Sequence, residues 1–372
     1  MIYFDNAATS GHKPQSVINA VNFALKNLSA NPGRSGHKAS ERVSDMVYNT
    51  RKKLADFFGA EGAEQVVFTQ NCTQSINFVI KGILKKGDHV LVSNLEHNAV
   101  MRPLFKTGIS FDTVSVFDDD NDTIFDFESK IKANTKLVIM TCASNVTGRI
   151  LPYAEIGEIC RKRGIYFCLD GAQGGGVLPI NMQKMHIDYL CIASHKGLYS
   201  PMGIGVLICR KPIENTIIEG GTGSSSLDFH QPNILPEMLE SGTLNVPAIA
   251  GLSAGVDFVS EAGIDSIYKK EMRLLKMFYD GLLKNQRIEL YTSQPTMHKY
   301  APVIPFNLKS VPSDRAAEFL NKNGIAVRAG LHCAPLAHKS IGTSNGGTLR
   351  ASFSVFNTEN EVIRVLNVLK NA

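Results

Sequence analysis

Two reactive side chains stand in unusual surroundings, far apart along this sequence. Lys196 ends the tetrad Ala193-Ser194-His195-Lys196, and Cys333 follows Gly330-Leu331-His332. A lysine amine can hold a carbonyl group covalently, and a cysteine thiolate is a nucleophile. Together they predict a protein that holds a carbonyl cofactor at the lysine and takes sulfur onto the cysteine.

A carboxylate strengthens the interpretation of the lysine. Asp170 ends the apolar run 165–169, so it should lie at the carboxyl edge of a sheet, where ligands bind. A carboxylate there suits a metal, a ribose hydroxyl or a protonated ring nitrogen, and capping of the next turn is an equally good explanation. Lys196, one strand further along, favours the ring nitrogen. Pyridoxal phosphate needs a lysine for its Schiff base and an acid that keeps its pyridine nitrogen protonated.

The same cofactor requires a phosphate cradle. Residues 70–75, Gln-Asn-Cys-Thr-Gln-Ser, join a predicted strand to a predicted helix. They offer hydroxyl groups and the free backbone N–H groups of a helix N-terminus. Thr73 and Ser75 could equally cap the helix, and the two roles are compatible.

The elements that must position these residues follow an alternating order. Short apolar runs predict buried strands, and the amphipathic stretches between them predict helices. This order predicts an α/β fold with a mainly parallel seven-stranded sheet flanked by helices. The predicted strands are 65–69, 89–93, 113–117, 137–142, 165–170, 189–193 and 205–209, and the helices are 75–84, 98–107 and 153–162.

The pattern changes after Pro247. Long helices over 248–283, interrupted near Gly263, precede strands at 288–291 and 303–306 and helices at 313–323 and 359–370. These elements predict a smaller α+β lobe. We expect a large cofactor-binding domain at 15–250 and a small domain, 1–14 plus 251–372, that carries Cys333.

Composition excludes several classes of protein. The 372 residues are 44% hydrophobic and 20% charged, as in a globular chain with a large core. The net charge of +5 is scattered in short clusters, which argues against a nucleic-acid partner. No segment is apolar enough to span a bilayer, and residues 1–6 do not resemble a signal peptide. The sequence therefore predicts a cytoplasmic protein with no membrane partner.

Seven cysteines lack Cys-x-x-Cys spacing, which argues against a disulfide framework and against a zinc site. We expect no metal. Five lie in or beside apolar runs and are expected in the core: Cys142, Cys160, Cys168, Cys191 and Cys209. Cys72 and Cys333 do not fit this description.

Taken together, these residues resemble the class V aminotransferase family of fold-type-I pyridoxal phosphate enzymes, in particular its cysteine desulfurase and selenocysteine lyase branch. The short span of sequence from Cys333 to Arg350 is similar to that of the Suf-type group, which commonly hands sulfur to an acceptor protein. One departure is that the family often has Ser-Gly-His-Lys where this chain has Ala193-Ser194-His195-Lys196. The resemblance runs nearly end to end, through Phe4–Thr9, Glu96-His97-Asn98, Ser144–Gly148, Asp170–Gln173, His195-Lys196, Glu240–Thr243, the Cys333 segment and Leu349–Ser352.

For the cofactor, the resemblance implies that Lys196 forms the Schiff base and that Asp170 pairs with the pyridine nitrogen. Gln173 would bind the phenolic oxygen. His97 would stack on the ring and assist proton transfer. The phosphate would be held by the Cys72 backbone, Thr73 and His195. Thr243 would reach the site of the neighbouring subunit in a homodimer.

For the substrate, the resemblance implies that Arg350 clamps the carboxylate of an amino acid, a task suited to a guanidinium fork. Arg328 would line the same pocket, with Asn145 near both the cofactor and the substrate. His97 could instead cap a helix, and Arg350 could be a surface strand residue.

The implied reaction converts L-cysteine to L-alanine and leaves a persulfide on Cys333 for an acceptor protein, as in sulfur mobilisation for iron–sulfur cluster assembly. Selenocysteine lyase activity is an alternative. A class V aminotransferase or lyase acting on another amino acid would need Lys196 and Asp170 but not Cys333. Gly330 and the glycines at 342, 346 and 347 predict a mobile segment around the thiol, and His332 could assist it.

Overall fold

A central seven-stranded sheet organises the chain. The computed structural model describes residues 1–33, 36–224 and 227–371. The strand order is β2-β8-β7-β6-β5-β3-β4, and the pairs are parallel except where β8 joins β2 and β7. The predicted mainly parallel sheet is confirmed. Its strands are β2 (Val66–Thr69), β3 (His89–Ser93), β4 (Ser110–Val114), β5 (Thr135–Thr141), β6 (Tyr166–Asp170), β7 (Tyr189–Ile192) and β8 (Gly205–Cys209).

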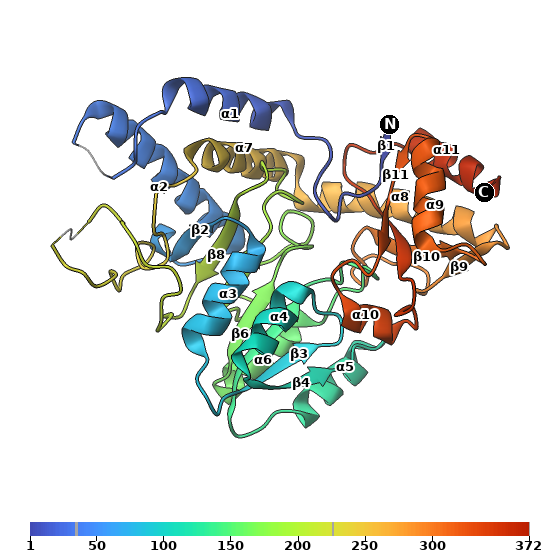
Figure 1. Cartoon of the computed structure of the whole chain (residues 1–372), viewed down its shortest axis with the longest axis horizontal. Helices are drawn as coiled ribbons and strands as arrows, with labels where there is room; N and C mark the ends of the chain where they lie inside the picture. The colour runs from blue at the N-terminus through green and yellow to red at the C-terminus, as the bar shows by residue number, and fades with distance from the viewer. Residues whose placement is uncertain (34–35, 225–226, 372) are drawn as a thin grey trace.

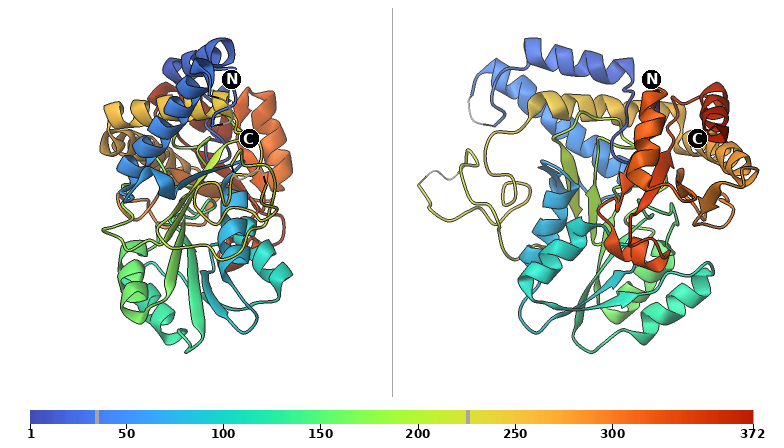
Figure 2. Two further views of the ribbon diagram at one scale, coloured as in Figure 1. Left: turned by 90° about the vertical axis from the view of Figure 1, so that its left-hand side faces the viewer. Right: turned by 45° about the vertical axis from the view of Figure 1, so that its right-hand side comes forward.

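Both faces of this sheet are buried because alternate strand residues enter two different cores. In β5, Leu137 and Ile139 pack in the core that contains α3 and α4, whereas Val138 and Met140 pack in the other. Successive side chains of a strand point to opposite faces, so continuous apolar runs are required when both faces are covered. Figure 2 shows the sheet nearly edge-on, with helices on either side.

The helices surround the sheet and extend beyond it. Figure 1 shows α1 beside α7 along one side of the molecule, and α8, α9 and α11 together near both chain ends. The helices are α1 (Gln15–Asn27), α2 (Lys38–Phe58), α3 (Cys72–Ile83), α4 (Asn98–Thr107), α5 (Asp120–Ser129), α6 (Tyr153–Arg163), α7 (Val246–Ala262), α8 (Ile264–Leu283), α9 (Ser313–Lys322), α10 (Pro335–Ser340) and α11 (Glu359–Lys370), with a 3-10 turn at Ala63–Gln65.

A second, antiparallel sheet lies toward the end of the chain, in the order β12-β13-β10-β9. The N-terminal strand β1 pairs in parallel with β11, as Ile2 opposite Ile325. The start of the chain is therefore joined to this later part, while the division at residues 14 and 250 stays a prediction. The strands are β1 (Ile2–Tyr3), β9 (Ile288–Leu290), β10 (Val303–Leu308), β11 (Ile325–Ala326), β12 (Arg328–Gly330) and β13 (Thr348–Ser352).

One strand was placed wrongly by its sequence pattern. The apolar residues of 113–117 predict a strand there, but β4 covers Ser110–Val114. It pairs with β3 alone, from His89 opposite Ser110 to Ser93 opposite Val114. An edge strand can extend only as far as its partner, so tertiary pairing overrode the local pattern. Within the described ranges, no helix has the length and apolar character needed to cross a membrane.

Candidate active site

A cavity of about 200 Å³ collects most of the predicted site residues at the carboxyl edge of the large sheet. Its wall is built from the ends of β6 and β7, the start of α3, the start of α4 and the N-terminal segment. Ten of the twelve predicted residues line it: Cys72, Thr73, His97, Asn145, Asp170, Gln173, His195, Lys196, Arg328 and Arg350.

Asp170 and Lys196 lie at adjacent strand ends, as their sequence positions predict. Asp170 is the last residue of β6, and its Oδ1 accepts a hydrogen bond from the Ala172 N–H at 2.9 Å. Lys196 lies in the turn after β7, and burial lowers the pKa of its amine while Asp170 opposes that shift. A lowered pKa favours the neutral amine, which is the nucleophilic form.

The start of α3 lies beside Asp170. Asn71 caps the helix by accepting from the Gln74 N–H at 3.0 Å, so the helix begins at Cys72 and points its first N–H groups at the cavity edge. The Cys72 thiol is 3.5 Å from Asp170 Oδ1, and burial raises its pKa well above its ordinary value. The Cys72 thiol is therefore protonated and belongs to the core. The part of Cys72 that suits ligand binding is its backbone N–H, at the start of α3.

His195 and Ser194, although adjacent in the sequence, have different surroundings. His195 lines the cavity, and its buried Nδ1 has no hydrogen-bond partner among the described residues. Burial lowers the pKa of His195 to about 4, so the ring is neutral. Ser194 is fully buried and donates to the Ile204 carbonyl at 2.8 Å. Ser194, one position later than the serine of the family's Ser-Gly-His-Lys pattern, therefore stabilises the fold and does not line the cavity. Thr73 provides a hydroxyl group that lines the cavity near the start of α3.

His97 and Gln173 combine a structural contact with a place on the cavity wall. His97 caps α4, because its Nδ1 accepts from the Ala99 N–H at 3.0 Å. Its pKa is lowered, mainly by burial. Gln173 Nε2 donates to the Ala7 carbonyl at 3.1 Å, which ties the N-terminal segment to the sheet. Capping therefore does not exclude a role for His97 in the cavity.

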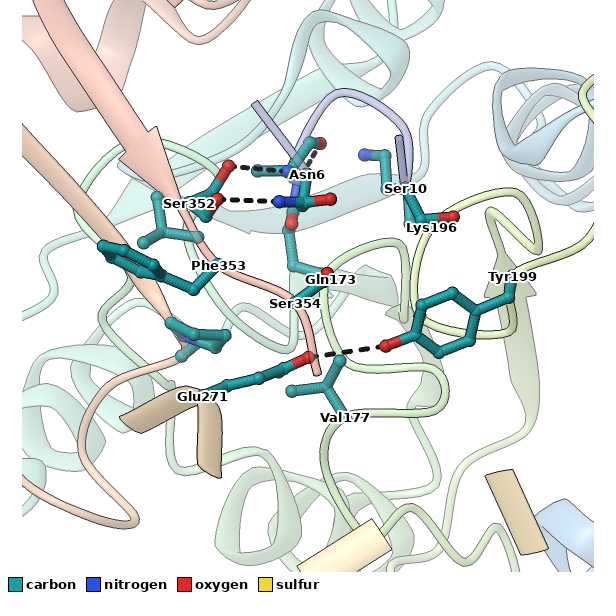
Figure 3. Close-up of a pocket in the computed structure, with 15 residues that line it drawn as sticks. Asn6, Ser10, Gln173, Val177, Lys196, Tyr199, Glu271, Ser352, Phe353 and Ser354 are labelled. Carbon is teal, nitrogen blue, oxygen red and sulfur yellow. Dashed lines mark hydrogen bonds between the residues drawn. The ribbon is translucent and has the colours of Figure 1, made fainter. Parts of the chain in front are cut away.

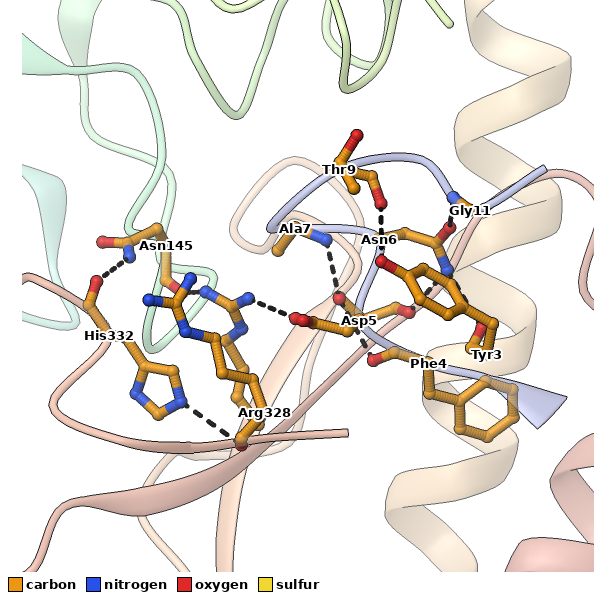
Figure 4. Close-up of polar contacts among 12 residues, drawn as sticks. Tyr3, Phe4, Asp5, Asn6, Ala7, Thr9, Gly11, Asn145, Arg328 and His332 are labelled. Atoms are coloured by element: carbon orange, nitrogen blue, oxygen red, sulfur yellow. Dashed lines mark hydrogen bonds and ion pairs between the residues drawn. The ribbon is translucent and has the colours of Figure 1, made fainter. Parts of the chain in front are cut away.

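Two arginines enter the cavity from the second sheet, where Arg328 in β12 stands opposite Arg350 in β13. Arg350 is 1% exposed, and it pairs with Asp5 Oδ1 at 2.6 Å and donates to the Asn145 carbonyl at 3.0 Å. Its Nε has no partner among the described residues. Figure 4 shows Asp5, Asn145 and Arg328 together. The sequence predicts no role for Asp5, although it stands in the Phe4–Thr9 motif, because its partner is 345 positions away.

Cys333 is exposed at the rim of the cavity and does not line it. The other cysteines are buried, as predicted for five of them, and all seven are free. The Cys333 thiol lies 3.9 Å from Arg328 Nη2. Its carbonyl accepts from the Asn98 N–H at 2.7 Å, which holds this segment against the start of α4. The thiol is accessible and adjacent to the cavity, as a nucleophile must be.

Thr243 lies apart from the cavity of Lys196. It lines a separate hollow of about 440 Å³ together with Gln70, Asn71 and Gln74. This hollow abuts the outer side of the α3 N-terminus. The predicted role of Thr243 at the site of a neighbouring subunit stays a prediction.

Lys196 also lines a small second cavity of about 30 Å³, whose wall includes the buried carboxyl group of Glu271. Glu271 is 2% exposed, and Tyr199 Oη donates to its Oε1 at 3.5 Å (Figure 3). Burial raises the pKa of Glu271 to about 8. The carboxyl group therefore keeps its proton at neutral pH.

Replacing this group, Glu271→Gln, should flatten the decline of stability with pH. The unfolded chain loses the Glu271 proton near the ordinary pKa of 4.5, so unfolding releases a proton between about pH 5 and pH 8. Its contribution to stability is complete below that window and is lost as the pH rises toward 8. Urea unfolding across the window measures the slope, with the exposed Glu128→Gln as control; parallel curves for wild type and Glu271→Gln would contradict the prediction.

A lysine and an aspartate at neighbouring strand ends of a mainly parallel sheet are typical of fold-type-I pyridoxal phosphate-dependent transferases. A family model described as Aminotransferase class-V matches residues 2–365. The chain belongs to this family.

Named relatives match along the full chain. A "Probable cysteine desulfurase" from Pyrococcus abyssi is 34% identical over 100% of this chain and 94% of its own length. A "Cysteine desulfurase" from Haloferax volcanii is 30% identical over 100% and 89%. Among solved structures, the apo cysteine desulfurase from Thermococcus onnurineus superposes with a TM-score of 0.88 at 33% identity, covering 100% of this chain and 94% of that one. CsdA of Escherichia coli also gives 0.88, at 27% identity and with 99% and 94% covered.

Proposed function

We propose that this protein is a pyridoxal phosphate-dependent cysteine desulfurase, which converts L-cysteine to L-alanine and keeps the sulfur as a persulfide on Cys333. The observation that carries the proposal is the exposed Cys333 thiol beside Arg328, at the rim of the cavity that contains Lys196 and Asp170. The relatives named cysteine desulfurase support the same activity.

The residues present fit pyridoxal phosphate. Lys196 would hold the carbonyl, and Asp170 would pair with the pyridine nitrogen. The α3 N-terminus at Cys72 and Thr73, with the unpartnered Nδ1 of His195, suits a phosphate group. Gln173 and Asn145 are the cavity-wall amides that would bind the phenolic oxygen and the substrate.

When bound, the cofactor supplies an electron sink for the bonding pairs left on the substrate Cα and Cβ. Arg350 binds the substrate carboxylate through its guanidinium group, which Asp5 orients. The Lys196 amine and His97, whose pKa values are both lowered by burial, would take and return the Cα proton. The Cys333 thiolate attacks the substrate sulfur, so that an S–S bond forms as the C–S bond breaks, and protonation at carbon completes alanine.

The partners belong to the same proposal. Thr243 acts from one subunit of a homodimer on the phosphate of the other, which suits its position in a hollow shared with Asn71. The persulfide passes to a sulfur-acceptor protein, for which the exposure of Cys333 is necessary.

Product analysis tests the proposal. The purified, cofactor-loaded protein is incubated with L-cysteine, and alanine and sulfide are quantified in the presence of a thiol reductant. Equimolar alanine and sulfide are expected, and L-selenocysteine in a parallel reaction measures the preference between sulfur and selenium. A keto acid in place of alanine would indicate an aminotransferase, and absence of cofactor absorbance after loading would overturn the enzyme assignment.

A further inference from the structure

The backbone that displays Cys333 adopts a conformation that needs external support. His332 and Cys333 have φ angles of 49° and 58°, so two consecutive residues with side chains occupy the left-handed region. Residues other than glycine adopt this region at a cost, and they persist there when the surroundings hold them. Asn145 Nδ2 donates to the His332 carbonyl at 2.8 Å, which supports the turn from the cavity side.

The opposite side of the turn is held by a buried chain of side chains. His332 is 3% exposed and His338 is fully buried, and their rings are nearly parallel, with 15° between planes. His332 Nδ1 lies 3.1 Å from His338 Nε2, and His338 Nδ1 lies 2.7 Å from Thr343 Oγ1. The remaining nitrogen, His332 Nε2, is 3.4 Å from the Arg328 carbonyl.

These contacts favour one direction of hydrogen bonding. The Arg328 carbonyl can only accept, so its contact with His332 Nε2 favours a proton on that nitrogen, with His332 Nδ1 accepting from His338 Nε2–H. His338 Nδ1 then accepts from the Thr343 hydroxyl. Both rings must be neutral for this arrangement, and burial lowers the pKa of His332 to about 3 and that of His338 to about 4.

Backbone contacts of Thr343 also join the two ends of the Cys333 segment. The Thr343 N–H donates to the His338 carbonyl at 2.8 Å, and the Gly347 N–H donates to the Thr343 carbonyl at 3.1 Å. A side chain at Gly347 would clash with the Gly330 backbone, at 2.3 Å. These contacts hold the two ends of the segment together, and the mobility expected from its glycines stays a prediction. His332 is buried and lines the cavity, whereas Cys333 is exposed.

We propose that His338 and Thr343 are positioning residues for Cys333, which act through His332 to hold the left-handed turn that presents the thiol at the cavity rim. The inference rests on the proposed function, because it gives the turn a task in sulfur transfer. Loss of the hydrogen bonds that join His332, His338 and Thr343 should leave substrate binding intact and slow the step in which the thiol attacks.

Matched variants test this role in the cofactor-loaded protein. Thr343→Val removes the hydroxyl at nearly constant shape, Thr343→Ser keeps it, and His338→Phe keeps a ring without nitrogens. We expect kcat for sulfide release to fall about 10-fold in Thr343→Val and further in His338→Phe, with KM for L-cysteine changed less than about 2-fold. Thr343→Ser should retain wild-type kcat.

Hydrogen exchange supplies a readout that is independent of catalysis. Peptides covering residues 331–343 should exchange about 10-fold faster in Thr343→Val and not in Thr343→Ser, while peptides from the large sheet stay unchanged. A raised KM with unchanged kcat, a lowered kcat without faster exchange of this segment, or equal effects of valine and serine would each overturn the proposal. If the wild-type protein released no sulfide, the proposed function would fall, whereas the exchange arm would still decide whether the chain holds the turn.

Discussion

The substitution Cys333→Ala should lower sulfide release from L-cysteine by about three orders of magnitude, a loss typical for a group that reacts directly with the substrate. The remaining cysteines are buried and cannot replace it. Burial also raises the pKa of Cys72, the cysteine beside Asp170, so its thiol stays protonated. Cofactor absorbance should be unchanged in the variant, because Cys333 does not line the cavity of Lys196.

Two controls make the measurement specific. Lys339→Ala changes an exposed residue of the same segment and should leave the rate within about 2-fold, as is usual for surface substitutions. Mass spectrometry of the wild-type protein after one turnover should show the additional sulfur on Cys333. Sulfide release by Cys333→Ala at the wild-type rate would rule out the persulfide route and favour another class V activity.

The substitution Lys196→Ala should abolish both alanine and sulfide formation, with a fall of at least about 10³-fold. Lys196 is the lysine in the cavity wall, and its lowered pKa makes the amine available for a covalent link. The variant should also lose the visible absorbance of the lysine-bound cofactor. Absorbance spectroscopy and product analysis are carried out on the same sample.

A conservative variant and a distant one complete this test. Lys196→Arg keeps a long basic side chain but cannot form the covalent link, so it should be as inactive as Lys196→Ala. Lys184→Ala removes an exposed lysine and should behave like the wild type. Retention of both absorbance and turnover in Lys196→Arg would disprove the covalent role of the lysine.

The sequence predicted the sheet well because the strands are buried on both faces. Continuous apolar runs, such as the one that ends at Asp170, mark such strands by composition alone. The alternation of runs and helices placed Asp170 and Lys196 at neighbouring strand ends, and this explains why the cofactor site could be inferred. The cysteine pattern likewise separated Cys333 from the five cysteines in apolar runs.

Contacts between distant segments were decided by the tertiary structure. Arg350 meets Asp5 across 345 positions, and the shifted bounds of β4 follow its single partner strand. A local pattern carries no information about which segments meet, because the free energy that favours one pairing comes from packing of the whole chain.

The two reactive residues of the site show the same division. Lys196 and Cys333 could be recognised as reactive from their neighbours in the sequence. Their separation into a lysine in the cavity wall and an exposed thiol at the rim depends on how the two sheets meet. So does the contact between the rings of His332 and His338, since burial is a property of the folded chain and it lowers the pKa of both rings.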